Sequence, residues 1–160
     1  MKSSILAVVL SVILLAISGC NRRTLTEPGE AMEPTIRTGE TVGFDGGAYS
    51  NHAPERWDVV AFHPLIATDD NMMTWALRVV GLPGEQISFS TDGNVLVGGS
   101  AIQPPPRIAS IRFVAGRDNA VVTVPQDAYY LVGDNPRHAW DSRWWGCLPR
   151  ARIIGKVTGK

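Results

Sequence analysis

Few residues of this chain are of types that act as nucleophiles, bases or metal ligands. Only three of the 15 basic residues are lysines, and none of these three lies between positions 3 and 155. All other basic residues are arginines, which do not release a proton in proteins and cannot act as bases. The histidines and cysteines show no spacing typical of a metal site, and we predict neither a metal nor a cofactor. These lysines, histidines and cysteines are Lys2, Lys156, Lys160, His52, His63, His138, Cys20 and Cys147.

The composition indicates one folded domain. The chain has 160 residues, a length that fits a single hydrophobic core. A 44% apolar fraction and five tryptophans exclude a disordered chain. The 15 acidic residues balance the 15 basic ones, which excludes a strongly basic nucleic-acid binder because no excess charge is left to neutralise phosphates. We therefore expect no nucleic-acid partner.

Residues 1–19 are typical of a secretion signal. Lys2 precedes an uncharged apolar run over residues 5–17, and Ile17-Ser18-Gly19 leads directly into Cys20. This end resembles the bacterial lipobox, which implies cleavage before Cys20 and its acylation, and several acyl chains anchor a protein stably. We predict a signal peptide at 1–19, a polar tether at 20–29 and a domain at 30–160. The predicted location is a bacterial membrane, with the domain facing the periplasm or the cell exterior, and an uncleaved anchor helix is the alternative.

Beyond this segment the sequence favours β-strands. No stretch has a helical period, and short β-rich runs are bounded by Gly, Pro, Asn or Asp. Thr91-Asp92-Gly93-Asn94 indicates a hairpin turn, and Pro104-Pro105-Pro106 an exposed extended connection. We therefore predict an all-β barrel or sandwich. The expected strands are 40–44, 58–62, 75–80, 86–90, 95–97, 108–114, 120–124, 129–132 and 153–157.

Four segments of the chain, taken together and in this order, form a recognisable set of motifs. They are residues 30–40, residues 56–62, residues 77–85, and a fourth that runs from residue 131 through 140–146 to 153–156. Together they resemble bacterial signal peptidase I, the membrane-bound serine endopeptidases that remove leader peptides. The resemblance covers residues 30–158. It implies a mainly β fold with a hydrophobic groove that holds a leader peptide in extended form.

The resemblance also implies a catalytic set, and this chain departs from it. In that family the first segment supplies a Ser nucleophile, the third a Lys base that burial keeps neutral, and the fourth a Ser that orients the Lys. The corresponding positions here are Ala31, Leu77 and Ala139. Glu85 replaces an Asp, and Trp57 stands where the family usually has Gly. The retained motif residues are Met32, Pro34, Thr35, Arg78, Gly81, Pro83, Gly84, Gly133, Asp134, Asn135, Asp141, Ser142 and Arg143.

The retained polar residues receive structural interpretations. We expect Arg78 to find a carboxylate partner and Asp141 to pair with Arg143. We expect Asp134 and Asn135 to close a turn through hydrogen bonds from side chain to backbone.

Several other side chains have two interpretations each. We expect Cys147 to pack as a small apolar residue, with a reactive thiol as the alternative. His63 is interpreted as a strand-end surface residue, whereas His138 is expected to come nearest to the former catalytic site. Trp144 and Trp145 would point to opposite faces if extended. Ordinary packing of the tryptophans and a tryptophan face resting on a membrane are the two alternatives.

Loss of nucleophile and base together predicts a protein without peptidase activity. We expect a non-catalytic signal-peptidase-like lipoprotein, attached through lipidated Cys20, whose groove binds signal peptides or other extended apolar segments by strand addition. The alternative is an active signal peptidase I-type serine endopeptidase with a rearranged active site. A third possibility is a closed groove and a purely structural domain.

Overall fold

The computed structural model describes residues 22–68, 73–114 and 120–160. The predicted signal peptide at residues 1–19 and the predicted lipidation site at Cys20 lie outside these residues. Within the described residues, no helix combines the length and the apolar character needed to cross a bilayer.

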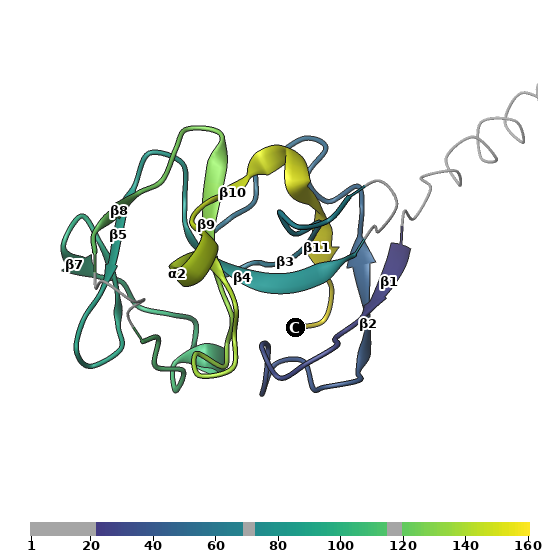
Figure 1. Ribbon diagram of the computed structural model, residues 1–160, viewed down its shortest axis with the longest axis horizontal. Helices are drawn as coiled ribbons and strands as arrows, with labels where there is room; N and C mark the ends of the chain where they lie inside the picture. Colours follow the sequence, from purple (N-terminus) through teal and green to yellow (C-terminus); the bar gives the residue numbers. More distant parts are fainter. Residues whose placement is uncertain (1–21, 69–72, 115–119) are drawn as a thin grey trace, which may run out of the picture.

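Two antiparallel sheets contain most of the regular secondary structure in the described residues, which confirms the all-β prediction (Figure 1). The larger sheet has the strand order β1-β2-β11-β3-β4-β9-β10, and the smaller has the order β7-β6-β5-β8. Helical structure in the described residues is limited to α2 (Ser142–Trp145) and two 3-10 turns, Pro106–Ile108 and Arg150–Arg152. The strands are β1 (Arg22–Thr26), β2 (Thr41–Asp45), β3 (Val59–Phe62), β4 (Trp75–Gly81), β5 (Gln86–Phe89), β6 (Val95–Val97), β7 (Ser100–Ala101), β8 (Val122–Thr123), β9 (Ala128–Val132), β10 (Leu148–Pro149) and β11 (Ile153–Val157).

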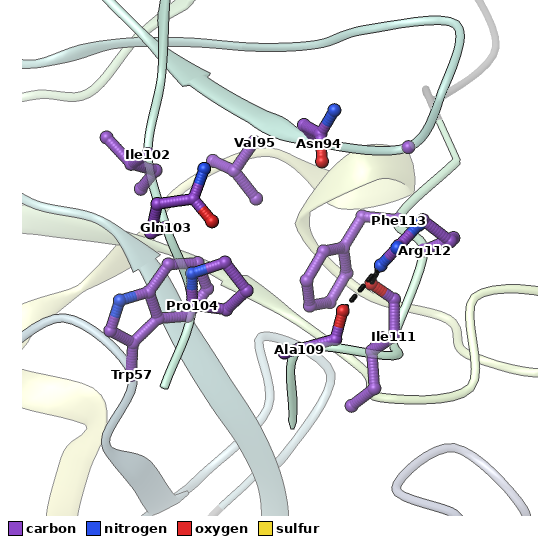
Figure 2. Close-up of a pocket in the computed structure, with 11 residues that line it drawn as sticks. Trp57, Asn94, Val95, Ile102, Gln103, Pro104, Ala109, Ile111, Arg112 and Phe113 are labelled. Carbon is purple, nitrogen blue, oxygen red and sulfur yellow. Dashed lines mark hydrogen bonds between the residues drawn. The ribbon is translucent and has the colours of Figure 1, made fainter. Parts of the chain in front are cut away.

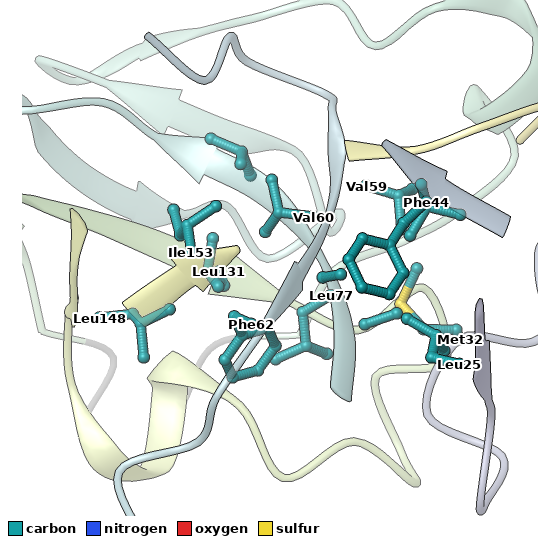
Figure 3. Close-up of a cluster of buried hydrophobic side chains, with 14 of the residues drawn as sticks. Leu25, Met32, Phe44, Val59, Val60, Phe62, Leu77, Leu131, Leu148 and Ile153 are labelled. Atoms are coloured by element: carbon teal, nitrogen blue, oxygen red, sulfur yellow. The ribbon is translucent and has the colours of Figure 1, made fainter. Parts of the chain in front are cut away.

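Two hydrophobic cores share β4 and β9. Along β9, Leu131 joins the first core, whereas Tyr130 and Val132 join the second, because successive side chains of a strand point to opposite faces. Both strands are buried on both faces, which explains their nearly continuous apolar sequences. Figure 3 shows Leu77 of β4 among the side chains of the first core, where it is 2% exposed.

The predicted hairpin at residues 91–94 connects β5 to β6. Phe89 pairs with Val95, and Ser90 N–H donates to Asn94 O at 2.9 Å. Gly93 has a φ of +79°, and a Cβ there would lie 2.8 Å from Cβ of Arg112. Glycine is the residue that accepts both conditions, so the Asp-Gly pattern predicted this turn correctly.

The structure differs from the sequence prediction within the tether. Residues 20–29 are predicted as a polar tether, but residues 22–26 form β1, which pairs with β2 at the edge of the larger sheet. Only Leu25 of this strand is buried. An edge strand with one buried side chain has no alternating apolar pattern, so residues 22–26 carry no sequence signal of a strand.

Residues 108–114 also differ from prediction, because they form no strand. The segment begins in the 3-10 turn, and Ile111 N–H donates to Ile108 O at 3.0 Å. Ile108, Ile111 and Phe113 are nevertheless buried in the second core. The apolar pattern of this segment therefore reflects burial and not strand pairing.

Trp144 and Trp145 lie in α2 and not in extended chain. The Trp145 ring packs 6.4 Å from the Phe62 ring, between centroids, whereas Trp144 is half exposed. One ring thus lies against the core and the other at the surface, as expected, but the short helix and not strand alternation separates them.

Candidate functional site

The three positions that the sequence resemblance assigns to the catalytic set lie together in the fold. Ala31 follows β1, Leu77 belongs to β4, and Ala139 lies between β9 and α2. Ala31 and Leu77 line one cavity of about 150 Å³. A Cβ placed on Gly133 would lie 2.4 Å from Cβ of Ala139 and 2.5 Å from O of Ala31, so both alanines flank this glycine. The structure thus brings residues from three distant segments to one place.

A buried ion pair links β4, which contains Leu77, to neighbouring segments of the chain. The Arg78 guanidinium, fully buried, donates from Nε to Asp134 Oδ1 at 2.7 Å and from Nη2 to Oδ2 at 2.6 Å. It also donates from Nη1 to Trp57 O at 2.7 Å, and from Nη2 to Thr35 Oγ1 at 3.3 Å. The Thr35 hydroxyl in turn donates to Asp134. One guanidinium thereby fixes β4 to the chain around residues 35, 57 and 134.

This network confirms the expected carboxylate partner of Arg78 and corrects the interpretation of Asp134. The Asp134 carboxylate is used by Arg78 and Thr35, so it does not close the predicted turn. The turn is closed by the backbone, where His138 N–H donates to Asn135 O at 3.1 Å. Asn135 N–H donates to Ala31 O at 3.0 Å and so ties this turn to the site.

A second ion pair holds the loop that carries Ala139. Arg143 donates from Nε to Asp141 Oδ1 at 2.8 Å and from Nη2 to Oδ2 at 2.6 Å, as the sequence predicts. Asp141 also accepts from Gly133 N–H at 2.9 Å, and the Ser142 hydroxyl oxygen accepts from Leu131 N–H at 2.9 Å. The C-terminal end of the loop is therefore fastened to β9 and to Gly133, the residue that follows β9.

The first motif segment is held by burial of Met32 and Ile36, which lie four residues apart. Met32 is fully buried in the first core and accepts a hydrogen bond from Ile36 N–H at 2.9 Å, whereas Pro34 is exposed. Burial of Met32 places its neighbour Ala31 at the cavity.

Trp57 occupies a backbone conformation that favours glycine. Its φ is +74°, in the left-handed region, where the sequence resemblance implies a Gly. The Trp57 ring stacks on Phe113 at 6.5 Å and lines a second cavity of about 80 Å³ with Ile102 and Pro104 (Figure 2). This second cavity is separate from the site, because none of Ala31, Leu77 and Ala139 lines it.

The first cavity lies beside a part of β4 that is paired on one side only. Residues 75–77 pair with β3, where Val60 lies opposite Leu77. On the other side of β4, pairing with β9 begins at Arg78. Among the described residues no strand covers this side of residues 75–77, and all three of them line the cavity. This side of β4 is therefore a place where an extended chain could add as a further strand.

The comparisons with known proteins agree with this architecture. The family model described as "Signal peptidase, peptidase S26" matches residues 1–159. The chain belongs to this family.

Relatives within the signal peptidase family match over most of the chain. A probable signal peptidase I-2 of Synechocystis is 32% identical over 132 residues, which cover 81% of this chain and 58% of the relative. A signal peptidase I of Leptolyngbya laminosa is 32% identical over 140 residues, which cover 82% and 64%. The chain thus spans less than two thirds of the length of these two relatives. The crystal structure of a signal peptidase I from Enterococcus faecalis has a TM-score of 0.50 at 28% identity and covers 66% of this chain and 97% of that one.

Neither lysine among the described residues lines the cavity of this signal peptidase scaffold. Lys156 Nζ lies 2.5 Å from Asp58 Oδ1, and Lys160 Nζ lies 2.5 Å from Glu40 Oε1. Both amines are therefore engaged in ion pairs with carboxylates that lie outside the cavity lining.

His138 does line the cavity, as the sequence analysis expects of the histidine nearest to the site. Its Nδ1 lies 2.9 Å from Glu30 Oε2, and both side chains are more than half exposed. His63 lies after β3 with Nδ1 2.8 Å from Met73 O. Cys147 is half-buried against the second core, and burial raises the pKa of its thiol, which favours packing over a reactive thiolate.

Glu27 is the cavity residue that sequence reasoning missed. It is 4% exposed, and burial raises the pKa of its carboxyl from 4.5 to about 7, although the Gly29 N–H acts in the opposite direction. Glu27 lines the cavity together with Ala31 and Leu77. A glutamate in a polar segment gives no sequence signal of burial, and its position four residues before Ala31 is the one available hint.

Proposed function

We propose that this chain is a non-catalytic signal-peptidase-like lipoprotein that binds extended apolar peptide segments, signal peptides among them, at the outer face of a bacterial membrane. The observation that carries the proposal is the cavity lined by Ala31 and Leu77, beside the open side of β4 at residues 75–77. A peptide strand paired there satisfies its backbone groups and directs alternate side chains into the cavity.

The lining of the cavity argues against the family's serine chemistry. Ala31 has no hydroxyl to attack a carbonyl carbon, and the buried Leu77 has no amine to accept a proton. A hydroxyl nucleophile needs a positioned base, and removal of both groups leaves only binding and residual positioning effects.

An active peptidase with a rearranged site is the second candidate function, and Glu27 is the observation that favours it. A carboxyl with a pKa of about 7 can take a proton from water near neutral pH and return it to a leaving group. Glu27 lies in the cavity that also contains Ala31, where a water molecule would replace the missing hydroxyl.

Cleavage assays with restored residues separate these two candidates. We expect the full-length protein in detergent to leave a leader-peptide substrate intact. The double variant Ala31→Ser, Leu77→Lys is expected to cleave it about 100-fold faster or more, because it regains a nucleophile and a base. Mass spectrometry of the products measures both reactions. Ala31→Ser alone is the matched control and should stay inactive, since its hydroxyl has no base. Cleavage by the unaltered protein that disappears in Glu27→Gln would replace the proposal with the second candidate.

Attachment to the membrane rests on Cys20 in this proposal. Cells fed a labelled fatty acid are expected to label the unaltered protein and the Cys147→Ala variant, which keeps the lipobox cysteine. Cys20→Ala is expected to lose the label and to retain residues 1–19, as measured by the mass of the purified chain. A labelled Cys20→Ala variant would contradict lipidation at this position.

A further inference from the structure

Glu27 holds a buried carboxylate oxygen without a partner. No hydrogen-bond partner for Oε2 occurs in the part of the chain that the structure describes. The backbone of Glu27 is fixed, because its N–H donates to Glu40 O at 3.0 Å and its O accepts from Gly39 N–H at 2.8 Å. These two hydrogen bonds hold the Glu27 backbone beside the cavity. A buried carboxylate oxygen that lacks a donor is costly, so a ligand that donates to Oε2 would be favoured.

The cavity has an excess of negative charge. Glu27 and Glu30 both line it, and His138 is the one basic side chain among the lining residues that the structure describes. His138 lies against Glu30 at 2.9 Å, so it is engaged away from Glu27. A cationic donor at Glu27 would balance the remaining carboxylate.

The rest of the lining suits a cation on an apolar stem. The rings of Trp75 and Trp140 lie 6.0 Å apart at 69°, and both line the cavity. Aromatic faces attract ammonium groups within about 6 Å. Ala31 and Leu77 supply apolar surface for a hydrocarbon chain. The volume of about 150 Å³ is adequate for such a group, because apolar cavities of about that size bind benzene.

We propose that this cavity binds the side chain of a lysine in the extended peptide, with its ammonium at Glu27 Oε2 and its four-carbon stem against Leu77. The inference rests on the proposed function, since the peptide paired beside β4 delivers the side chain. A lysine fits better than an arginine, because one free carboxylate oxygen matches a compact ammonium, whereas a planar guanidinium favours two oxygens.

Paired peptides test this inference. The probes are acetyl-Ala-Val-Lys-Ala-Val-amide and the same peptide with norleucine in place of lysine, which keeps the stem and removes the ammonium. Isothermal titration calorimetry on the full-length protein in detergent is expected to give the lysine peptide a dissociation constant about tenfold lower. Glu27→Gln is expected to abolish this preference. Glu55→Gln, an exposed glutamate outside the cavity lining, is the matched control and should keep it.

Each outcome of this experiment distinguishes the two proposals. Equal binding of both peptides to the unaltered protein would overturn the lysine inference and leave peptide binding intact. No binding of either peptide would overturn both. A preference that survives in Glu27→Gln would remove Glu27 from the site. If Glu27→Gln does not fold by circular dichroism, Trp140→Ala serves instead, because Trp140 is 48% exposed, and an undiminished preference in that variant would overturn the assignment.

Discussion

Replacement of Asp134 by alanine is expected to lower the free energy of unfolding by about 3 to 5 kcal/mol. Arg78 is fully buried, and its two hydrogen bonds to Asp134, of 2.7 and 2.6 Å, form a bidentate pair. The variant leaves the guanidinium in the interior without its counter-charge, which is far more costly than replacing both partners. Chemical denaturation at pH 7 measures the loss.

Glu40→Gln is the matched control for Asp134→Ala. Glu40 also forms an ion pair, with Lys160 at 2.5 Å, but both side chains are partly exposed to solvent, so this pair contributes less than a buried one. The control is therefore expected to lose much less stability than Asp134→Ala. Equal losses in the two variants would contradict the view that the Arg78–Asp134 pair holds the scaffold together.

The partner of Arg78 illustrates how far the sequence could lead. An arginine inside an apolar strand indicates that some carboxylate must lie opposite, and that expectation is confirmed. The sequence near Arg78 does not identify the partner, because Asp134 lies 56 residues away. The Asp134-Asn135 pair is also typical of a turn, which favours a different role for Asp134. The strands predicted correctly, such as β5 and β6, are those with clear apolar runs and a turn signal between them.

The elements that were missed share a physical cause. β1 exposes nearly all of its side chains at a sheet edge, so its sequence resembles a tether. Residues 108–114 bury apolar side chains without pairing to a strand, so their sequence resembles one. The family resemblance located Ala31, Leu77 and Ala139, which the fold places together, but it gave no indication of Glu27. Glu27 lines one cavity with residues 75–77, 138 and 140, which lie far away in the sequence, and no local pattern records this.

Glu27 is expected to make the domain less stable as the pH rises from 5 to 8. Burial raises the pKa of its carboxyl from 4.5 to about 7, so the folded protein binds the proton more tightly than the unfolded chain does. Between these two pKa values the unfolded chain has released a proton that the folded state retains. Stability contributed by this proton is complete below pH 4.5 and is lost as the pH rises through 7.

The comparison of the unaltered protein with Glu27→Gln isolates this effect, because every other titrating group is shared. The quantity compared is the free energy of unfolding of the variant minus that of the unaltered protein. This difference is expected to rise by about 2 to 3 kcal/mol between pH 5 and pH 8, because each pKa unit of difference between the folded and unfolded states corresponds to about 1.4 kcal/mol. Urea denaturation at the two pH values measures it. A difference that does not change with pH would mean that the Glu27 carboxyl titrates alike in the folded and unfolded states. A bound lysine peptide should reduce the pH dependence, since an ammonium at Oε2 holds Glu27 ionised and lowers its pKa.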